Sequence, residues 1–207
     1  MDIALVNTNT LSRMSPEYLA LAAERAATMC APHFQPERFG YEFRSWVSPY
    51  TKGANRLGGF AFVLQDWASE EGLRTFNPDI QRHGRTPELL TNVRLEALLH
   101  RVLGVSLAEV YVTNAFPFVK GGPMSAALRV RDVREAARVF LARELQLAKP
   151  THVFALGVVA KVALEACATS YIHLPHPAAR IGGLATHEEA WRVALSKAGF
   201  SGTSGVA

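Results

Sequence analysis

Apolar residues along the chain follow two repeating patterns, which predict strands and helices in alternation. Short, nearly continuous apolar runs are typical of buried strands, and they occupy 60–64, 109–113, 153–156 and 171–172. Apolar side chains at helical spacing, with helix start and stop signals at the ends, predict helices. The predicted helices occupy 15–30, 88–103, 130–147, 157–167 and 186–197. Strands and helices that alternate in this way favour right-handed crossovers and a parallel sheet.

This alternation predicts a single α/β domain with three layers, in which a parallel sheet of about four strands lies between helices. A chain of 207 residues, 49% of them hydrophobic, is long enough to bury one sizeable core. We expect residues 1–57 to form a helical region and a loop that pack on this domain, and residues 199–207 to form a flexible tail. The polar residues 70–87 are predicted to form a long irregular loop.

Composition narrows the possible partners and the compartment. The 22 Lys and Arg against 18 Asp and Glu give a formal net charge of +4, which permits contact with a polyanion without requiring it. The chain has two cysteines, Cys30 and Cys167. Two are too few for the four thiolates that hold an iron–sulfur cluster, and they do not form a disulfide framework. No signal peptide is recognisable, and no apolar run approaches the length of a membrane span. We therefore expect a monomeric cytoplasmic protein without membrane contact.

Three polar side chains follow apolar strand segments and are candidates for a common site. Asp66 follows the first strand, Asn114 the second and His176 the last. The carboxyl ends of parallel strands form the crevice where open α/β sheets bind ligands, so these residues are expected to converge. Each one alone could instead shape a turn or cap a helix. His173 and His176 lack nearby carboxylates or thiols at ligand spacing, so we expect no metal and no organic cofactor.

The segments around these residues resemble motifs of the uracil-DNA glycosylase superfamily. In that superfamily an acid, a uracil-binding amide and a histidine follow one another in this order. The corresponding segments here are Leu64-Gln65-Asp66-Trp67, Val112-Thr113-Asn114-Ala115 and His176-Pro177-Ala178-Ala179. The resemblance covers roughly residues 58–183 and, because the chain has two cysteines, is to a divergent branch without an iron–sulfur cluster.

The resemblance implies an enzyme that flips uracil out of DNA and hydrolyses its N-glycosidic bond, leaving an abasic site and free uracil. Asp66 would stabilise the sugar cation and orient the attacking water. His176 would donate a hydrogen bond to uracil O2 as negative charge develops there. Asn114 would pair with N3–H and O4, an arrangement that cytosine does not match. As a DNA repair enzyme the protein would be associated with the nucleoid.

An aromatic side chain is also needed to stack on the flipped base. Phe76 is the first candidate and Trp67 the second, with ordinary core packing as the alternative for both. Gln65 is assigned to substrate binding as part of the first motif. Trp67 and Ala68 stand where the best-known branch has the Pro-Tyr pair that excludes the thymine methyl group, so the means of excluding thymine stays open.

Cations followed by glycines come after two of the proposed site residues. Lys120 precedes a glycine pair, and Arg180 precedes Gly182 and Gly183. Glycine lets backbone amides approach phosphates, while the cation neutralises them. These four residues are therefore predicted to contact DNA. Arg180 could alternatively fill the gap left by the flipped base, or be a surface cation without a role.

Two other functions fit the same sequence. The altered loop after His176 is compatible with a protein that binds uracil-containing DNA and turns over poorly. A doubly wound enzyme that acts on a free nucleotide is the other alternative, because this fold supports many chemistries.

Overall fold

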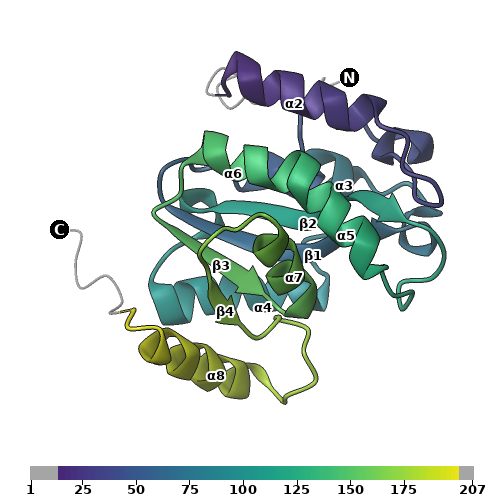
Figure 1. Cartoon of the computed structure of the whole chain (residues 1–207). Helices are drawn as coiled ribbons and strands as arrows, with labels where there is room; N and C mark the ends of the chain where they lie inside the picture. The colour runs from purple at the N-terminus through teal and green to yellow at the C-terminus, as the bar shows by residue number, and fades with distance from the viewer. Residues whose placement is uncertain (1–13, 201–207) are drawn as a thin grey trace, which may run out of the picture.

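Four parallel strands form the central sheet of the protein (Figure 1). The structure, a computed structural model, describes residues 14–200. The strands lie side by side in the order β2-β1-β3-β4, and each neighbouring pair is parallel. Their bounds are β1 (Phe60–Ser69), β2 (Tyr111–Lys120), β3 (His152–Leu156) and β4 (Ile172–Leu174). The predicted single domain with a parallel sheet of about four strands is confirmed.

Helices cover both faces of this sheet and give the protein three layers (Figure 1). One face is covered by α4 (Leu90–Leu98), η4 (Leu99–Leu103) and α8 (Leu184–Lys197). The other is covered by α5 (Val130–Ala136), η6 (Ala137–Leu141), α6 (Ala142–Ala148) and α7 (Val158–Ala166). Strand β1 alternates between them, with Ala61 and Val63 toward the second layer and Phe62 and Leu64 toward the first. Burial on both faces explains why the strand is continuously apolar.

The N-terminal part of the described chain contains α2 (Pro16–Ala27), η1 (Pro36–Phe39) and η2 (Pro49–Gly53). Helix α2 packs on the second helical layer through α6, whereas η2 contacts β2. Arg25 is fully buried and donates hydrogen bonds to the main-chain oxygens of Phe43 (2.6 Å) and Trp46 (3.0 Å). This buried guanidinium thereby connects α2 to the segment that leads into η2.

Helix α2 ends at Ala27, earlier than the predicted end at residue 30. The side-chain amide of Gln35 donates hydrogen bonds to the carbonyls of Arg25 and Thr28, both at 2.7 Å. These bonds satisfy carbonyl groups that the helix end leaves without partners. The predicted helices at 88–103 and 130–147 form as continuous helical segments, and Gly104 with φ 69° ends the first of them.

Strands β1 and β2 extend well beyond their apolar segments, which corrects the prediction that the polar site residues follow the strands. Asp66 and Asn114 lie within β1 and β2, and the two strands remain paired as far as Ser69 and Lys120. Between Asp66 and Ala68 the register shifts by one residue, as in a β-bulge. β1 pairs with β3 only as far as Val63, so beyond that residue one edge of β1 is open.

The segment 70–87 is more ordered than predicted. It contains η3 (Glu71–Leu73) and α3 (Pro78–His83). The Asn77 side chain caps α3 by accepting a hydrogen bond from the Asp79 amide, and Gly84 ends it with φ 72°. A Cβ atom at Gly84 would lie 1.8 Å from the Pro49 carbonyl oxygen, so only glycine allows this close approach.

The last described residues also pack on the domain. Phe200 makes edge contacts with Phe60, His152 and Phe154. Residues 201–207 of the predicted tail, and residues 1–13 of the predicted N-terminal region, lie outside the described residues. Among residues 14–200 no helix has the length and apolar character needed to cross a membrane. η5 (Leu107–Glu109) precedes β2 and completes the set of described elements.

Candidate active site

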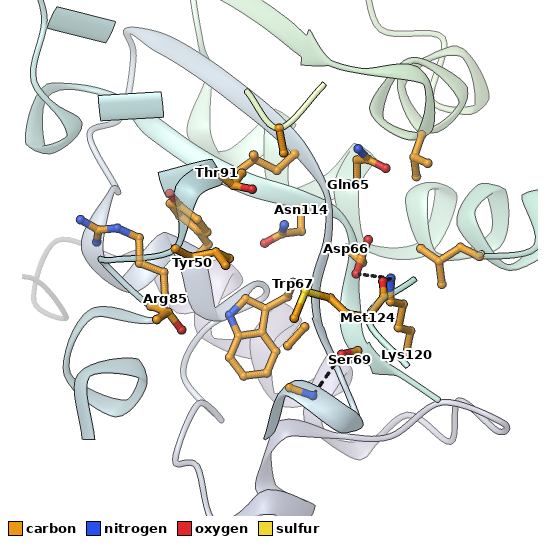
Figure 2. A pocket seen from close by; sticks show the side chains of 18 of the residues that line it. Tyr50, Gln65, Asp66, Trp67, Ser69, Arg85, Thr91, Asn114, Lys120 and Met124 are labelled. Atoms are coloured by element: carbon orange, nitrogen blue, oxygen red, sulfur yellow. Dashed lines mark hydrogen bonds and ion pairs between the residues drawn. The ribbon is translucent and has the colours of Figure 1, made fainter. Parts of the chain in front are cut away.

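A cavity of about 580 Å³ lies at the carboxyl ends of β1 and β2 (Figure 2). Its volume is typical of small-molecule sites. Asp66, Asn114 and His176 all line it, so the structure brings together the three residues that the sequence analysis placed in one site. The open edge of β1 beyond Val63 gives the loop that carries His176 access to the same space.

Asp66 projects its carboxylate into the cavity beside a lysine (Figure 2). Its Oδ2 atom lies 3.1 Å from Nζ of Lys120, which also donates a hydrogen bond to the Met124 carbonyl at 2.7 Å. The Lys120 side chain is only 8% exposed. The structure thus places the ammonium group buried and paired inside the cavity, and contact of Lys120 with DNA phosphates stays a prediction.

Asn114 is buried, and a serine fixes the orientation of its amide. Ser48 Oγ donates a hydrogen bond to Oδ1 of Asn114 at 2.7 Å and accepts one from the Tyr50 amide at 3.3 Å. The Ser48 hydroxyl thus donates its one proton to Oδ1, which is the acceptor in this pair. Within residues 14–200 no other hydrogen bond reaches the Asn114 side chain, so the second lone pair of Oδ1 and the two Nδ2 protons remain for a ligand. The sequence gives no indication that Ser48 belongs to the site. It indicates only that Ser48 can cap the helix η2, which it does.

His176 is a neutral imidazole with a defined tautomer. Its Nδ1 atom accepts a hydrogen bond from the Ala178 amide at 3.1 Å, so the proton is on Nε2. Burial lowers the pKa of His176 to about 4, a change that the nearby Asp66 carboxylate opposes and His187 reinforces. The side chain therefore offers a neutral N–H donor to the cavity.

The comparison with known families agrees with this geometry. The model of the uracil DNA glycosylase superfamily matches residues 59–195, which span β1 to α8. The chain belongs to the uracil DNA glycosylase superfamily. A search of curated proteins found no match. Asp66, Asn114 and His176 fall within the residues that the superfamily model matches, whereas Ser48 and Tyr50 precede them.

Among the aromatic candidates for base stacking in this superfamily member, Trp67 lines the cavity and Phe76 does not. Phe76 is 51% exposed and stacks on Tyr41 with ring centroids 4.9 Å apart. Phe76 therefore lies outside the cavity in this structure, and its stacking on the base stays a prediction. The Trp67 indole N–H donates to the Gly84 carbonyl at 2.7 Å, and its ring edge packs on Phe43.

Gln65 also lines the cavity, next to the turn that begins α7. A Cβ atom at Gly157 would lie 3.0 Å from Cβ of His176 and 3.6 Å from Nε2 of Gln65. Gly157 has φ 86°, in the region that favours glycine. The glycine thus allows the Gln65 and His176 side chains to approach the same turn.

Arg180, Gly182 and Gly183 are exposed in the loop between His176 and α8, and they do not line the cavity. Side chains of the first helical layer hold this loop. Arg94 donates to the Pro177 carbonyl at 3.2 Å, and the Trp191 indole donates to the Pro175 carbonyl at 2.9 Å. The loop is thereby fixed beside the cavity with its tip exposed, and contact of Arg180, Gly182 and Gly183 with DNA stays a prediction.

A second set of polar residues lines the opposite wall and was missed by the sequence analysis. The Tyr50 hydroxyl donates to Oδ1 of Asn92 at 3.0 Å, and Nδ2 of Asn92 donates to the Thr86 carbonyl at 2.6 Å. The Arg85 guanidinium carbon lies 5.7 Å from the centre of the Tyr50 ring. Asn92 was the one feature of the sequence that could have indicated this wall, because it is a polar residue that becomes buried within an otherwise apolar helix position.

Metal ligands do not gather in the part of the chain that the structure describes. Within residues 14–200 no group of three or more His, Cys, Asp or Glu side chains is placed to hold a metal ion. His173 is exposed on β4. Cys30 and Cys167 are free thiols, and burial raises the pKa of each to about 11.

Proposed function

We propose that the protein is a DNA repair glycosylase, which flips uracil out of DNA and hydrolyses its N-glycosidic bond to leave an abasic site. One observation carries this proposal: a carboxylate, a fixed amide and a neutral imidazole line one cavity in a chain of the uracil DNA glycosylase superfamily. A base inside a duplex is out of reach of such a cavity, so the nucleotide must be extruded first.

Asp66 is the residue proposed to act at the sugar. As the bond from C1′ to N1 of uracil breaks, positive charge develops on the sugar and negative charge on the base. The carboxylate stabilises the cationic sugar and accepts a proton from the water that attacks C1′, as carboxylates do in glycoside hydrolysis. The new C1′–O bond completes an abasic sugar, and the electron pair of the broken bond leaves with uracil.

His176 is proposed to stabilise the leaving uracil anion. A neutral imidazole with its proton on Nε2 can donate to O2 of uracil, where negative charge develops. The donor is already oriented by the hydrogen bond at Nδ1, so it needs little rearrangement during the reaction. A preorganised donor of this kind contributes about 10²-fold to 10³-fold in rate.

Asn114 is proposed to distinguish uracil from cytosine. Its Nδ2 group donates to O4 of uracil, and Oδ1 accepts from N3–H through the lone pair that Ser48 leaves unused. Cytosine presents an acceptor at N3 and a donor at the exocyclic amine, so both contacts become unfavourable in this amide orientation. The exposed loop with Arg180 is proposed to contact the DNA backbone beside the cavity.

An oligonucleotide with one internal deoxyuridine tests the proposal. Uracil release is followed by alkaline cleavage at the abasic site, in single-stranded and double-stranded substrates, for wild type and for Asp66→Ala, Asn114→Ala and His176→Ala. We expect release by wild type and a loss of about 10²-fold or more for Asp66→Ala and His176→Ala. His100→Ala, a change of an exposed histidine on the helical segment after α4, is the matched control and should behave as wild type.

Two outcomes of this experiment would contradict the proposal. Equal release by wild type and all three variants would show that the site is assigned wrongly. Salt-dependent binding of the oligonucleotide without any uracil release would identify a binding protein instead of an enzyme.

A further inference from the structure

Lys120 occupies an unusual position for a lysine, buried at the end of β2 inside the cavity. Its side chain is 8% exposed, and its ammonium nitrogen contacts Oδ2 of Asp66 at 3.1 Å and the Met124 carbonyl at 2.7 Å. Lysines are almost never fully buried unless they are paired. A buried ammonium therefore needs these two acceptors, and one of them is the carboxylate proposed to act at the sugar.

The loop that supplies the second acceptor is itself anchored. Glu71 accepts a hydrogen bond from the Met124 amide at 3.1 Å, and Glu70 accepts one from the Gly122 amide at 3.0 Å. The Met124 carbonyl is thus held next to Lys120 by residues of η3 and the turn before it. The ammonium group is fixed from two sides, and it in turn fixes Oδ2 of Asp66.

The two oxygens of the Asp66 carboxylate consequently have different surroundings. Oδ2 is occupied by Lys120, whereas no hydrogen bond or ion pair from residues 14–200 reaches Oδ1. Oδ1 is therefore the oxygen available to a water molecule or to the sugar. The charged groups that face Asp66 are Lys120 on β2 and, when protonated, His176 on the loop after β4.

We propose that Lys120 is a positioning residue, which holds Oδ2 of Asp66 and thereby turns Oδ1 toward the sugar and the attacking water. The inference rests on the proposed function, because it assumes that Asp66 acts there. The ammonium weakens the field that the carboxylate exerts on the sugar cation. A carboxylate turned away from C1′, however, could neither stabilise that cation nor accept a proton from the attacking water, so holding its orientation has the larger effect.

Single-turnover uracil release as a function of enzyme concentration tests this role. Lys120→Met should lower the maximal rate by about 10²-fold, since a misplaced carboxylate loses its alignment. The enzyme concentration that gives half the maximal rate should stay unchanged, because Asp66 acts on the sugar as the bond breaks and not on DNA binding. Lys120→Arg keeps a cation that can hold Oδ2 and should recover part of the lost rate.

Two controls separate this role from a purely structural one. Lys161→Met removes a partly exposed lysine paired with Glu165 at 3.8 Å and should leave the maximal rate unchanged. Lys120→Gln keeps a polar side chain without the charge, and should show the same loss of maximal rate if Lys120→Met does not fold. Circular dichroism establishes that each variant is folded.

The inference and the proposed function fail in different ways. If wild type releases no uracil, the proposed function fails. If wild type releases uracil and the folded, uncharged variants keep its maximal rate, Lys120 does not position Asp66. A loss confined to the half-maximal enzyme concentration, with the maximal rate unchanged, would equally overturn the proposal.

Discussion

Glu144 on α6 has a carboxyl group buried behind the strand that carries Asn114. Its two oxygens accept hydrogen bonds from the hydroxyls of Tyr111 (2.7 Å) and Thr113 (2.8 Å). Thr51 Oγ1 lies 3.3 Å from the same carboxyl group and 3.2 Å from the Val112 carbonyl. Three hydroxyl groups can thus donate to this one buried carboxyl group.

Burial raises the pKa of Glu144 from 4.5 to about 7, although the three hydroxyl groups oppose the change. The folded protein therefore binds this proton more tightly than the unfolded chain does. The resulting stabilisation is fully present below pH 4.5 and is lost as pH rises through about 7. It corresponds to ~3 kcal/mol in the free energy of unfolding, of which ~2 kcal/mol is lost between pH 5.5 and pH 8.

Glu144→Gln removes this titration while keeping a side chain of the same shape. We expect urea denaturation to show that the variant loses ~2 kcal/mol less stability than wild type between pH 5.5 and pH 8. Glu135→Gln changes an exposed carboxylate on α5 and should follow wild type at both pH values. If wild type and Glu144→Gln had parallel stability profiles, the carboxyl group would be ionised throughout and the reasoning about its burial would be refuted.

Three further predictions concern the cavity. Ser48→Ala removes the donor that orients the Asn114 amide, so the ratio of uracil to cytosine excision should fall by up to about tenfold. Parallel release assays on the two substrates measure this ratio, and an unchanged ratio would count against the role of Ser48. Trp67→Ala removes an aromatic wall of the cavity and the hydrogen bond to Gly84, and should lower the affinity for single-stranded uracil-containing DNA by roughly tenfold or more in a fluorescence titration. Phe76→Ala should leave uracil release within about twofold of wild type, because its ring lies outside the cavity; a tenfold loss would show that Phe76 reaches the base in the DNA complex.

The order of strands and helices could be predicted from the sequence, because a continuous apolar run or a helical period reports burial locally. The extent of β1 and β2 could not. Main-chain hydrogen bonds between these strands continue to Ser69 and Lys120 whatever the side chains are, so polar residues with no strand signal became part of the sheet. The capped helix α3 was missed for a similar reason, since its six residues carry too little periodicity.

Asp66, Asn114 and His176 could be named from the sequence because parallel strands bring their carboxyl ends to one edge, and the superfamily carries these residues in the same order. The sequence by itself thus determined the fold class and the three polar groups at that edge. Only the tertiary structure decided which partners these groups have. Ser48 contacts Asn114, which lies 66 residues further along the chain, and Lys120 pairs with Asp66. Such pairings depend on the distance between side chains in the folded protein. The order of residues along the chain does not indicate which distant residues come into contact.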